Sequence, residues 1–313
     1  MAWMALNCPQ CGTPLPRVAL WRSVKCGSCG SLIAKTESVV TRDSFHQALK
    51  RAREKSADLD ALLCGGCRYH LMQKLGAGEI SQVYLARRIG SLPFLATIKL
   101  SSAPGAAAFY SREAQVLQEL QALDGEGVGA YFSRLMPELI SQGAVEGNDG
   151  EQALVLRHPS GFWGSLAALS EHFASGLDPR HAVWIWRRIL EVLDFIHSHG
   201  WSHGNMRPEH ALVHPKDHGV RLIGWSSAKK DAGENDKAGD LSRSARVMQV
   251  LLCGASGSGD LPHGVPTGLA QLVTRATIDE NFCRSQGAKG LDTLLLAEAK
   301  AAFGPPSFVP LTI

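Results

Sequence analysis

Residues 203–213 read His-Gly-Asn-Met-Arg-Pro-Glu-His-Ala-Leu-Val, and this stretch decides the fold of the chain. Residues 180–199, directly before it, carry apolar side chains at the spacing of a helix. The polar residues of the stretch have limited chemistry. The amide of Asn205 cannot act as a base near neutral pH, and a neutral imidazole such as His210 is a poor ligand for a hard cation. The sequence therefore predicts a helix running into a loop that lacks both of these functions.

Further segments with recognisable features follow one another around this stretch. They are a glycine-rich segment (75–86), a strand with a lysine (97–100), a helical pattern (111–120), a short apolar strand (153–156), the segment 222–226 and a helix start at Asp240. A single glycine-rich loop would be weak evidence because such loops arise by chance. Several segments in a fixed order, at plausible spacings, are strong evidence for one fold.

Taken together, these segments resemble the protein kinase-like superfamily, in the form of a bacterial Ser/Thr-kinase-like pseudokinase. The catalytic loop of the family reads H-R-D-L-K-P-E-N. The present chain keeps His203, Arg207, Pro208 and Glu209 of that frame. The resemblance covers roughly residues 69–303 and implies a bilobal α+β fold. The N-lobe would hold an antiparallel sheet and helix C, and the C-lobe would be mainly helical.

The same resemblance implies that the catalytic positions are degenerate. Asn205 replaces the aspartate that accepts the substrate proton, and His210 replaces the asparagine that holds magnesium. Gly224 stands where the D-F-G aspartate would bind magnesium. Gly204 replaces the arginine that pairs with an activation-loop phosphate, and residues 225–239 are short for an activation segment. We therefore expect no catalytic residue at the degenerate positions, His203 included, and no bound Mg²⁺.

By resemblance, a nucleotide site would comprise Gly76, Gly78, Val83, Lys99, Glu113 and the gatekeeper Leu156. The backbone N–H that usually donates to adenine would belong to Pro159, which has none. An unpaired buried acceptor costs about 1–3 kcal/mol, which argues against ordinary ATP binding. Lys99 and Glu113 are nevertheless retained. They would either position a nucleotide or form an ion pair that fixes helix C, and we favour the ion pair.

Four of the eight cysteines form two CxxC pairs, Cys8 with Cys11 and Cys26 with Cys29. This spacing predicts a zinc ribbon in which four thiolates hold one structural Zn²⁺. The alternative is a pair of disulfides or free thiols. The chain shows no signal peptide and no run of about 18 apolar residues. We therefore expect a cytoplasmic protein without membrane attachment, and a reducing compartment favours metal over disulfide.

A third CxxC, Cys64 and Cys67, directly precedes the kinase-like region. It could recruit His70 for a second metal site, form a redox pair or simply make a turn, and the sequence leaves these readings open.

The expected order of domains follows from these assignments. It is a zinc ribbon (1–36), a helical linker (37–68), a kinase-like domain (69–303, its lobes meeting near residues 158 and 159) and a Pro-rich apolar tail (304–313). A chain of 313 residues with 45% hydrophobic residues suits one small metal module and one large domain. We expect the apolar tail to pack along the C-lobe or to enter the groove of a partner.

We therefore expect a catalytically impaired pseudokinase that serves as a zinc-ribbon scaffold or allosteric regulator of a protein partner in bacterial signalling. By analogy with ribbon-bearing bacterial kinase-like proteins, that partner would be an active kinase, a phosphatase or a von Willebrand A domain protein. The alternative is a divergent ATP-dependent protein kinase, or another nucleotide-binding transferase, that uses Lys99 and Glu113. The modest net charge of +3 argues against nucleic acid as the partner.

Overall fold

The computed structural model describes residues 24–25, 32–33, 61–78, 80–90, 93–123, 132, 135–254 and 260–313. In its first part, strands β1 (Val24–Lys25) and β2 (Leu32–Ile33) pair in antiparallel fashion. The predicted zinc ligands Cys8, Cys11, Cys26 and Cys29 lie outside the described residues, as do residues 37–60 of the predicted linker. The chain divides into a sheet unit (1–114 and 139–161) and a helical unit (115–138 and 162–313).

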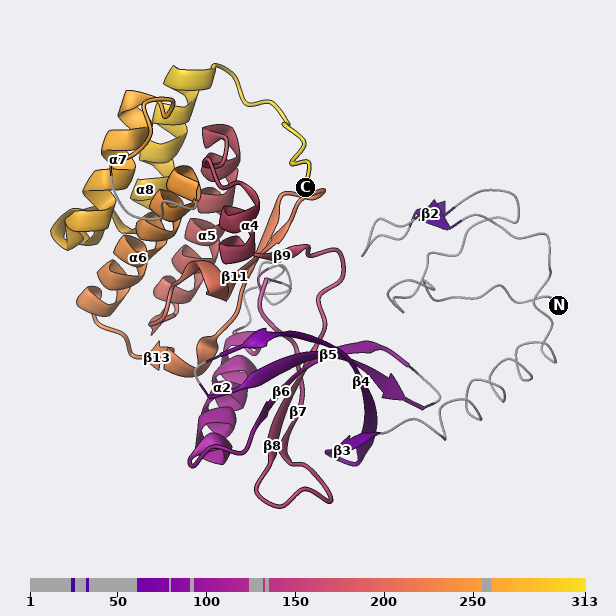
Figure 1. The fold of residues 1–313 in the computed structure, drawn as a ribbon. Coiled ribbons are helices and arrows are strands. Elements are labelled where there is room, and N and C mark those ends of the chain that lie inside the picture. The colour runs from indigo at the N-terminus through magenta and orange to yellow at the C-terminus, as the bar shows by residue number, and fades with distance from the viewer. Residues whose placement is uncertain are drawn as a thin grey trace. The chain divides into compact units, whose positions relative to one another are not determined.

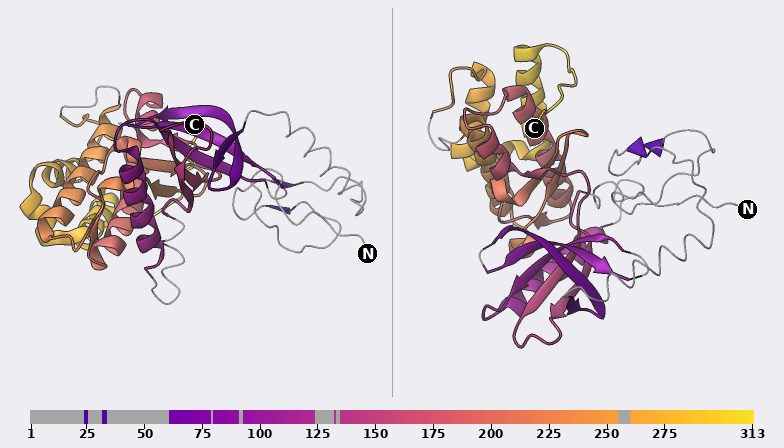
Figure 2. Two further views of the ribbon diagram at one scale, coloured as in Figure 1. Left: turned by 90° about the horizontal axis from the view of Figure 1, so that it is seen from below. Right: turned by 45° about the vertical axis from the view of Figure 1, so that its right-hand side comes forward.

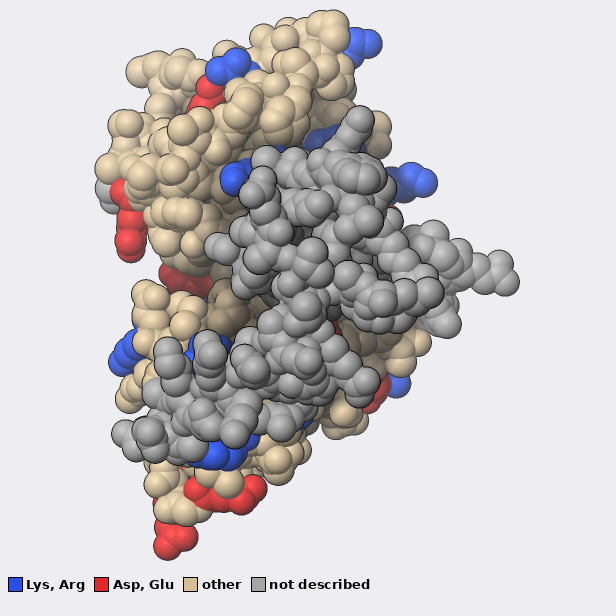
Figure 3. Space-filling view, turned by 90° about the vertical axis from the view of Figure 1, so that its right-hand side faces the viewer, with Lys and Arg blue, Asp and Glu red and all other residues tan. Residues whose placement is uncertain are grey.

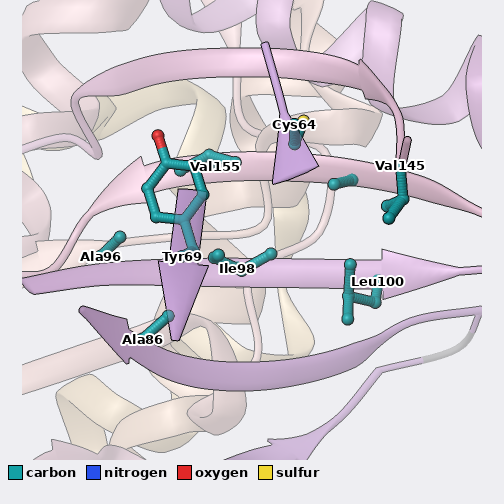
Figure 4. Packing of buried hydrophobic residues seen from close by; sticks show 9 residues of the cluster. Cys64, Tyr69, Ala86, Ala96, Ile98, Leu100, Val145 and Val155 are labelled. Atoms are coloured by element: carbon teal, nitrogen blue, oxygen red, sulfur yellow. The ribbon is translucent and has the colours of Figure 1, made fainter. Parts of the chain in front are cut away.

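The sheet unit contains a six-stranded antiparallel sheet in the order β3-β4-β5-β6-β8-β7 (Figure 1). Its strands are β3 (Leu62–Cys64), β4 (Cys67–Ala77), β5 (Gln82–Ile89), β6 (Leu95–Ser101), β7 (Leu139–Ala144) and β8 (Gln152–Arg157). Side chains of a strand alternate between its two faces. Ala96, Ile98 and Leu100 of β6 therefore join the buried apolar cluster on one face, shown in Figure 4. The intervening residues, including Lys99, belong to the opposite face.

The sheet begins at Leu62, inside the range that the sequence predicted as a helical linker. The reason is the Gly65-Gly66 turn, in which both residues have positive φ angles of 57° and 69°. Such two-residue turns match the twist of an antiparallel hairpin, and glycine adopts their conformation without steric cost. Cys64 and Cys67 consequently lie opposite each other where β3 meets β4. Leu63 also accepts a hydrogen bond from the backbone of Glu146, 2.9 Å away.

The helical unit is built mainly from helices that follow the sheet in the chain (Figure 2). They are α4 (Leu166–His172), α5 (Pro179–Ser198), α6 (Glu234–Cys253), α7 (Thr267–Ile278) and α8 (Glu280–Phe303). Helix α5 confirms the helical pattern predicted for residues 180–199. Its first turn is stabilised because the Asp178 side chain accepts a hydrogen bond from the backbone of Arg180 and because Pro179 occupies that turn. Its apolar face, with Ile185, Trp186 and Leu193, is buried.

Two small antiparallel sheets complete the helical unit. In one, β9 (Gly164–Ser165), β11 (Ala211–His214) and β12 (Gly219–Leu222) lie in the order β12-β11-β9. In the other, β10 (Trp201–Ser202) pairs with β13 (Lys229–Lys230). Short 3₁₀ turns, η1 (Pro208–His210) and η2 (Trp225–Ser227), lie between these strands in the chain. The strands therefore bracket the loop of residues 203–207.

Residues 304–313 follow α8 without regular structure and pack on the helical unit. Leu311 is buried, and the carbonyl of Val309 accepts from Nε2 of His218 at 2.9 Å. The ring of Phe308 stacks on the His218 imidazole, with centroids 4.2 Å apart. Of the two expectations for this tail, packing against the same chain is the one observed.

The described residues thus form a mixed α/β structure with an antiparallel sheet and six helices, α2 (Ala106–Gln121) among them. The division between the two units falls within α2. None of the described helices is long and apolar enough to span a membrane.

Candidate functional site

Lys99 of β6 and Glu113 of α2 form a bidentate ion pair. The lysine Nζ lies 2.7 Å from Oε1 and 2.8 Å from Oε2 of the carboxylate. The Glu113 side chain is 1% exposed and the Lys99 side chain 16%. The predicted ion pair is therefore confirmed, and it is almost wholly withdrawn from water. A pair in such surroundings is screened little by salt.

Three other predicted nucleotide-site residues, Gly76, Val83 and Leu156, lie on strands of the same sheet as Lys99. Val83 is its register partner on β5, and Gly76 pairs with Val83 from β4. On the other side, Leu156 pairs with Thr97, which stands two residues before Lys99. Because residues two apart share a face, Val83, Lys99 and Leu156 line the same face of the sheet. The structure thus places these three residues on one face of the sheet.

The glycine-rich loop between β4 and β5 is tied down by Ser81, which stands at the third glycine of the family pattern. The hydroxyl of Tyr110 on α2 donates to Ser81 Oγ at 2.8 Å, and Ser81 is buried. The backbone N–H of Gly78 donates to the Ser81 carbonyl, also at 2.8 Å. The Gly78 amide that such a loop could offer to a phosphate is therefore used within the protein, and the Ser81 side chain is held by Tyr110.

The segment after β8 likewise offers little to an adenine ring. The backbone N–H of His158 donates to the carbonyl of Leu95 at 3.1 Å, and its Nδ1 lies 2.9 Å from Thr97 Oγ1. The next residue is Pro159, which has no N–H. Neither residue has a backbone donor left for a ligand.

In the helical unit, the carboxylate of Asp240 on α6 holds the loop that begins at His203. Its oxygens accept from the backbone N–H groups of His203 at 2.7 Å and Gly204 at 2.9 Å. They also accept from His197 Nε2 at 3.1 Å and from the Arg243 guanidinium at 2.9 Å. Burial alone would raise the pKa of Asp240, but hydrogen bonds from the His197 side chain and the His203 backbone help to lower it below its usual value. The carboxylate is therefore charged and fully satisfied.

His203 is held as a neutral imidazole in this loop. Its Nε2–H donates to the Ile223 carbonyl at 3.1 Å, and its Nδ1 accepts from the Asn205 N–H at 3.2 Å. Burial lowers the pKa of His203 to about 4, although Asp240 opposes the shift. Both nitrogens are occupied by backbone partners, so His203 organises the loop and is not free to exchange protons.

Gly204 and Gly224, which the resemblance marked as degenerate positions, leave little room for a larger side chain. Gly204 has a φ of 76°, and a Cβ there would lie 2.4 Å from the Ser227 carbonyl oxygen. Gly224 has a φ of 79°, and a Cβ there would lie 2.9 Å from the His210 ring. Sequence reasoning identified both replacements but not these contacts, which join residues far apart in the chain.

His210 and Asn205 form the last part of the site. The Nδ1–H of His210 donates to the backbone carbonyl of Asn205 at 2.7 Å, and this bond fixes the ring beside Gly224. The position that would bind magnesium through an aspartate therefore faces an imidazole instead. The described residues contain no group of three or more His, Cys, Asp or Glu side chains placed to share a metal ion.

Comparison with known proteins indicates a distant kinase-like relationship. Serine/threonine-protein kinase D of Synechocystis sp. is 27% identical over 168 residues, which cover 53% of this chain and 31% of that protein. A protein kinase of Oryza sativa, found in both the japonica and the indica subspecies, is 25% identical over 193 residues, covering 61% of this chain and 30% of that protein. The matches thus span about a third of the length of these curated relatives. No protein-family model matches the chain.

Replacing Glu113 by alanine should destabilise the protein strongly because it leaves the Lys99 ammonium without its buried partner. Breaking such a pair costs about 3–5 kcal/mol. Glu119→Ala is a matched control on the same helix, since Glu119 pairs with the exposed Lys230, and we expect it to cost less than about 1 kcal/mol. Urea unfolding of both variants measures the difference. Equal losses would show that the Lys99–Glu113 pair contributes no more than a surface pair.

Gly224→Ala should lose more stability than Gly200→Ala. The two glycines have nearly the same φ, 79° and 77°, but a Cβ at Gly200 meets nothing within 4 Å. Gly200→Ala therefore reports the backbone cost alone, about 1–2 kcal/mol. The excess at Gly224 reports contact with the His210 ring and should shrink when Gly224→Ala is combined with His210→Ala. A double variant whose loss equals the sum of the two single losses would refute a steric coupling.

Proposed function

We propose that this chain is a pseudokinase whose sheet and helical units are the two lobes of a kinase-like domain, and that it regulates or scaffolds a protein partner in bacterial signalling. One observation carries the proposal. The supporting contacts of a kinase-like fold, Lys99–Glu113 and the loop held by Asp240, are formed, while the positions that would perform the chemistry are replaced. The distant similarity to Ser/Thr protein kinases supports the kinase-like part.

In this proposal, the loss of catalysis would involve several positions at once. Phosphoryl transfer needs a group that orients the nucleophile and metal ions that neutralise the phosphates. Asn205 offers an amide at the first position. The space beside Gly224 is taken by the His210 ring, and Gly204 has no room for an arginine. Restoring a single residue would therefore not rebuild the site, because its parts act as a unit.

The short segment after Gly224 supports a role that does not involve phosphorylation of an activation loop. Strand β13 pairs with β10, with Trp201 opposite Lys230, and the Ala232 N–H donates to the Gly200 carbonyl at 2.8 Å. Lys229 pairs with Asp236, and Lys230 with Glu119. Because the segment is already held by these contacts, it has no need of a phosphate to order it.

A protein is the partner class that we favour, in the form of an active kinase, a phosphatase or a von Willebrand A domain protein, and we place the complex in the cytoplasm. On the part of the face that Figure 3 shows uncovered, Lys and Arg side chains occur at separate places, some with Asp or Glu beside them. Nucleic-acid sites usually gather basic side chains on one face. The choice among the three protein partners rests on analogy with ribbon-bearing bacterial kinase-like proteins.

A thermal-shift assay with ATP, with and without magnesium, tests the proposed function. We expect no change in melting temperature and no transfer of labelled phosphate, because His158 and Pro159 offer no free backbone donor and neither Gly224 nor His210 offers magnesium a carboxylate. A magnesium-independent shift that Lys99→Ala abolishes would instead indicate a nucleotide-sensing pseudokinase. Phosphate transfer abolished by Lys99→Met would overturn the proposal in favour of a divergent kinase.

The predicted ribbon should bind about one zinc ion per chain through the four thiolates of Cys8, Cys11, Cys26 and Cys29. A module of this size buries too little core to fold alone, so metal binding would supply its folding free energy. Elemental analysis should find the zinc in the wild type and lose it in a Cys8→Ser, Cys11→Ser variant. A Cys64→Ser, Cys67→Ser variant is the control and should keep it. Zinc retained by the first variant would contradict the ribbon.

A further inference from the structure

We propose that Cys64 and Cys67 form a reversible dithiol–disulfide pair that exchanges with small-molecule disulfides such as glutathione disulfide. The two cysteines lie where β3 meets β4, at the start of the sheet. They contribute nothing to the pseudokinase argument above, and the inference stands independently of it.

The hairpin sets the two cysteines at a distance that a disulfide can bridge. Cys64 and Cys67 are direct register partners across the Gly65-Gly66 turn. Cα atoms of directly opposite residues in antiparallel strands are about 4.5–5.5 Å apart. Disulfides join Cα atoms about 4.4–6.8 Å apart. The backbone therefore needs no large movement for the bond to form.

Both thiols lie on the same face of the hairpin, because register partners share a face. Leu62 and Tyr69, the pair two residues further along, share that face and pack with the same apolar cluster. Cys64 and Tyr69 are fully buried, whereas Cys67 is partly exposed. Figure 4 shows Cys64 and Tyr69 within the apolar cluster. Cys67 is therefore the more exposed of the two residues, and Cys64 lies opposite it on the neighbouring strand.

The turn requires glycine for two reasons. The turn that results keeps Cys64 and Cys67 opposite each other. Gly65 and Gly66 have φ angles of 57° and 69°, a region that residues with side chains rarely adopt. A Cβ on Gly65 would in addition lie 2.9 Å from Cβ of Ser141 on β7. The turn is thus pressed against a neighbouring strand, and its shape is fixed.

The surroundings of the two thiols favour an uncharged disulfide over thiolates bound to a metal ion. Burial raises the pKa of the Cys64 thiol, and the carboxylate of Glu146 raises it further, although the Ser141 hydroxyl acts in the opposite direction. A site that disfavours the thiolate disfavours metal binding, since metals bind thiolates. The described residues also offer these two sulfurs no third His, Cys, Asp or Glu as a ligand. A disulfide carries no charge and needs no further ligand.

The proposed thiol–disulfide exchange with glutathione disulfide takes place in two displacement steps. The Cys67 thiolate attacks glutathione disulfide, forming a mixed disulfide and releasing one glutathione thiolate. The Cys64 thiolate then attacks the Cys67 sulfur and releases the second. The two thiol protons end on the two glutathione molecules, so the protein dithiol is oxidised and glutathione disulfide is reduced.

The disulfide would report the redox state of its surroundings and would add little to the stability of the fold. It closes a loop of only four residues, Cys64 to Cys67, and the loss of chain entropy in the unfolded state grows with loop length. Disulfides of this kind, short and partly accessible, are the labile ones that respond to the redox poise of the compartment.

Equilibration of the full chain in glutathione buffers, followed by acid quenching, alkylation and trypsin digestion, tests the proposal. Cleavage after Lys55 and Arg68 places Cys64 and Cys67 together in the peptide 56–68, which holds no other cysteine. With excess reduced glutathione both should be alkylated. With excess glutathione disulfide the peptide should lose the mass of two hydrogens and resist alkylation, and dithiothreitol should reverse the change.

Single variants identify the two roles. Cys64→Ser should trap a glutathione adduct on Cys67, and Cys67→Ser should leave Cys64 largely unmodified because it is buried. Cys283→Ser is the matched control at another buried cysteine and should leave the oxidation of peptide 56–68 unchanged. The proposal fails if the wild-type peptide stays fully alkylated at every glutathione ratio, or stops at an adduct without forming the internal disulfide. It also fails if zinc protects both thiols from alkylation in the Cys8→Ser, Cys11→Ser variant.

Discussion

The buried carboxylate of Asp240 is the constraint on which the helical unit depends. A charge that is removed from water is tolerable only when its oxygens are fully hydrogen-bonded. Here two backbone amides of the 203–207 loop, His197 and Arg243 supply the donors. The requirement works in both directions, because the same amides would be unsatisfied without the carboxylate. The loop keeps its shape for this reason, although Asn205 at its centre cannot act as a base.

The same interdependence links Gly204 and Gly224 to the residues around them. Once Gly224 has a φ of 79° and lies against the His210 ring, a side chain at 224 requires both a strained backbone and a displaced imidazole. The ring itself is held by its bond to the Asn205 carbonyl. Gly204 lies against the Ser227 carbonyl in the same way. The loop, the 224 position and the segment after it therefore form one packed unit in which a single reversal is resisted by its neighbours.

In the sheet unit, several separate contacts hold helix α2 and the first hairpin to the sheet. Lys99 and Glu113 form a nearly water-free pair, which can hold helix α2 to β6 whether or not a nucleotide ever binds. Ser81 adds a second link between the sheet and α2 through Tyr110. At the far end of the sheet, the Gly65-Gly66 turn brings two thiols together beside the strand that carries Ser141. These contacts involve different residues, so the proposed thiol pair shares none of the contacts that hold Lys99 to Glu113.

The sequence by itself determined the features that local pattern controls. Apolar spacing located helix α5, and the order of the segments indicated a kinase-like arrangement in which Lys99 would meet Glu113. The pattern failed at the start of the sheet, where helical spacing was extended through Leu62 although the Gly-Gly turn makes a hairpin. Only the tertiary structure decided that Gly224 lies against His210, that Ser81 is bound by Tyr110 and that His158 has no free backbone donor. Each of these facts is a contact between residues far apart in the chain, and residue type does not reveal which distant neighbour fills the space beside it.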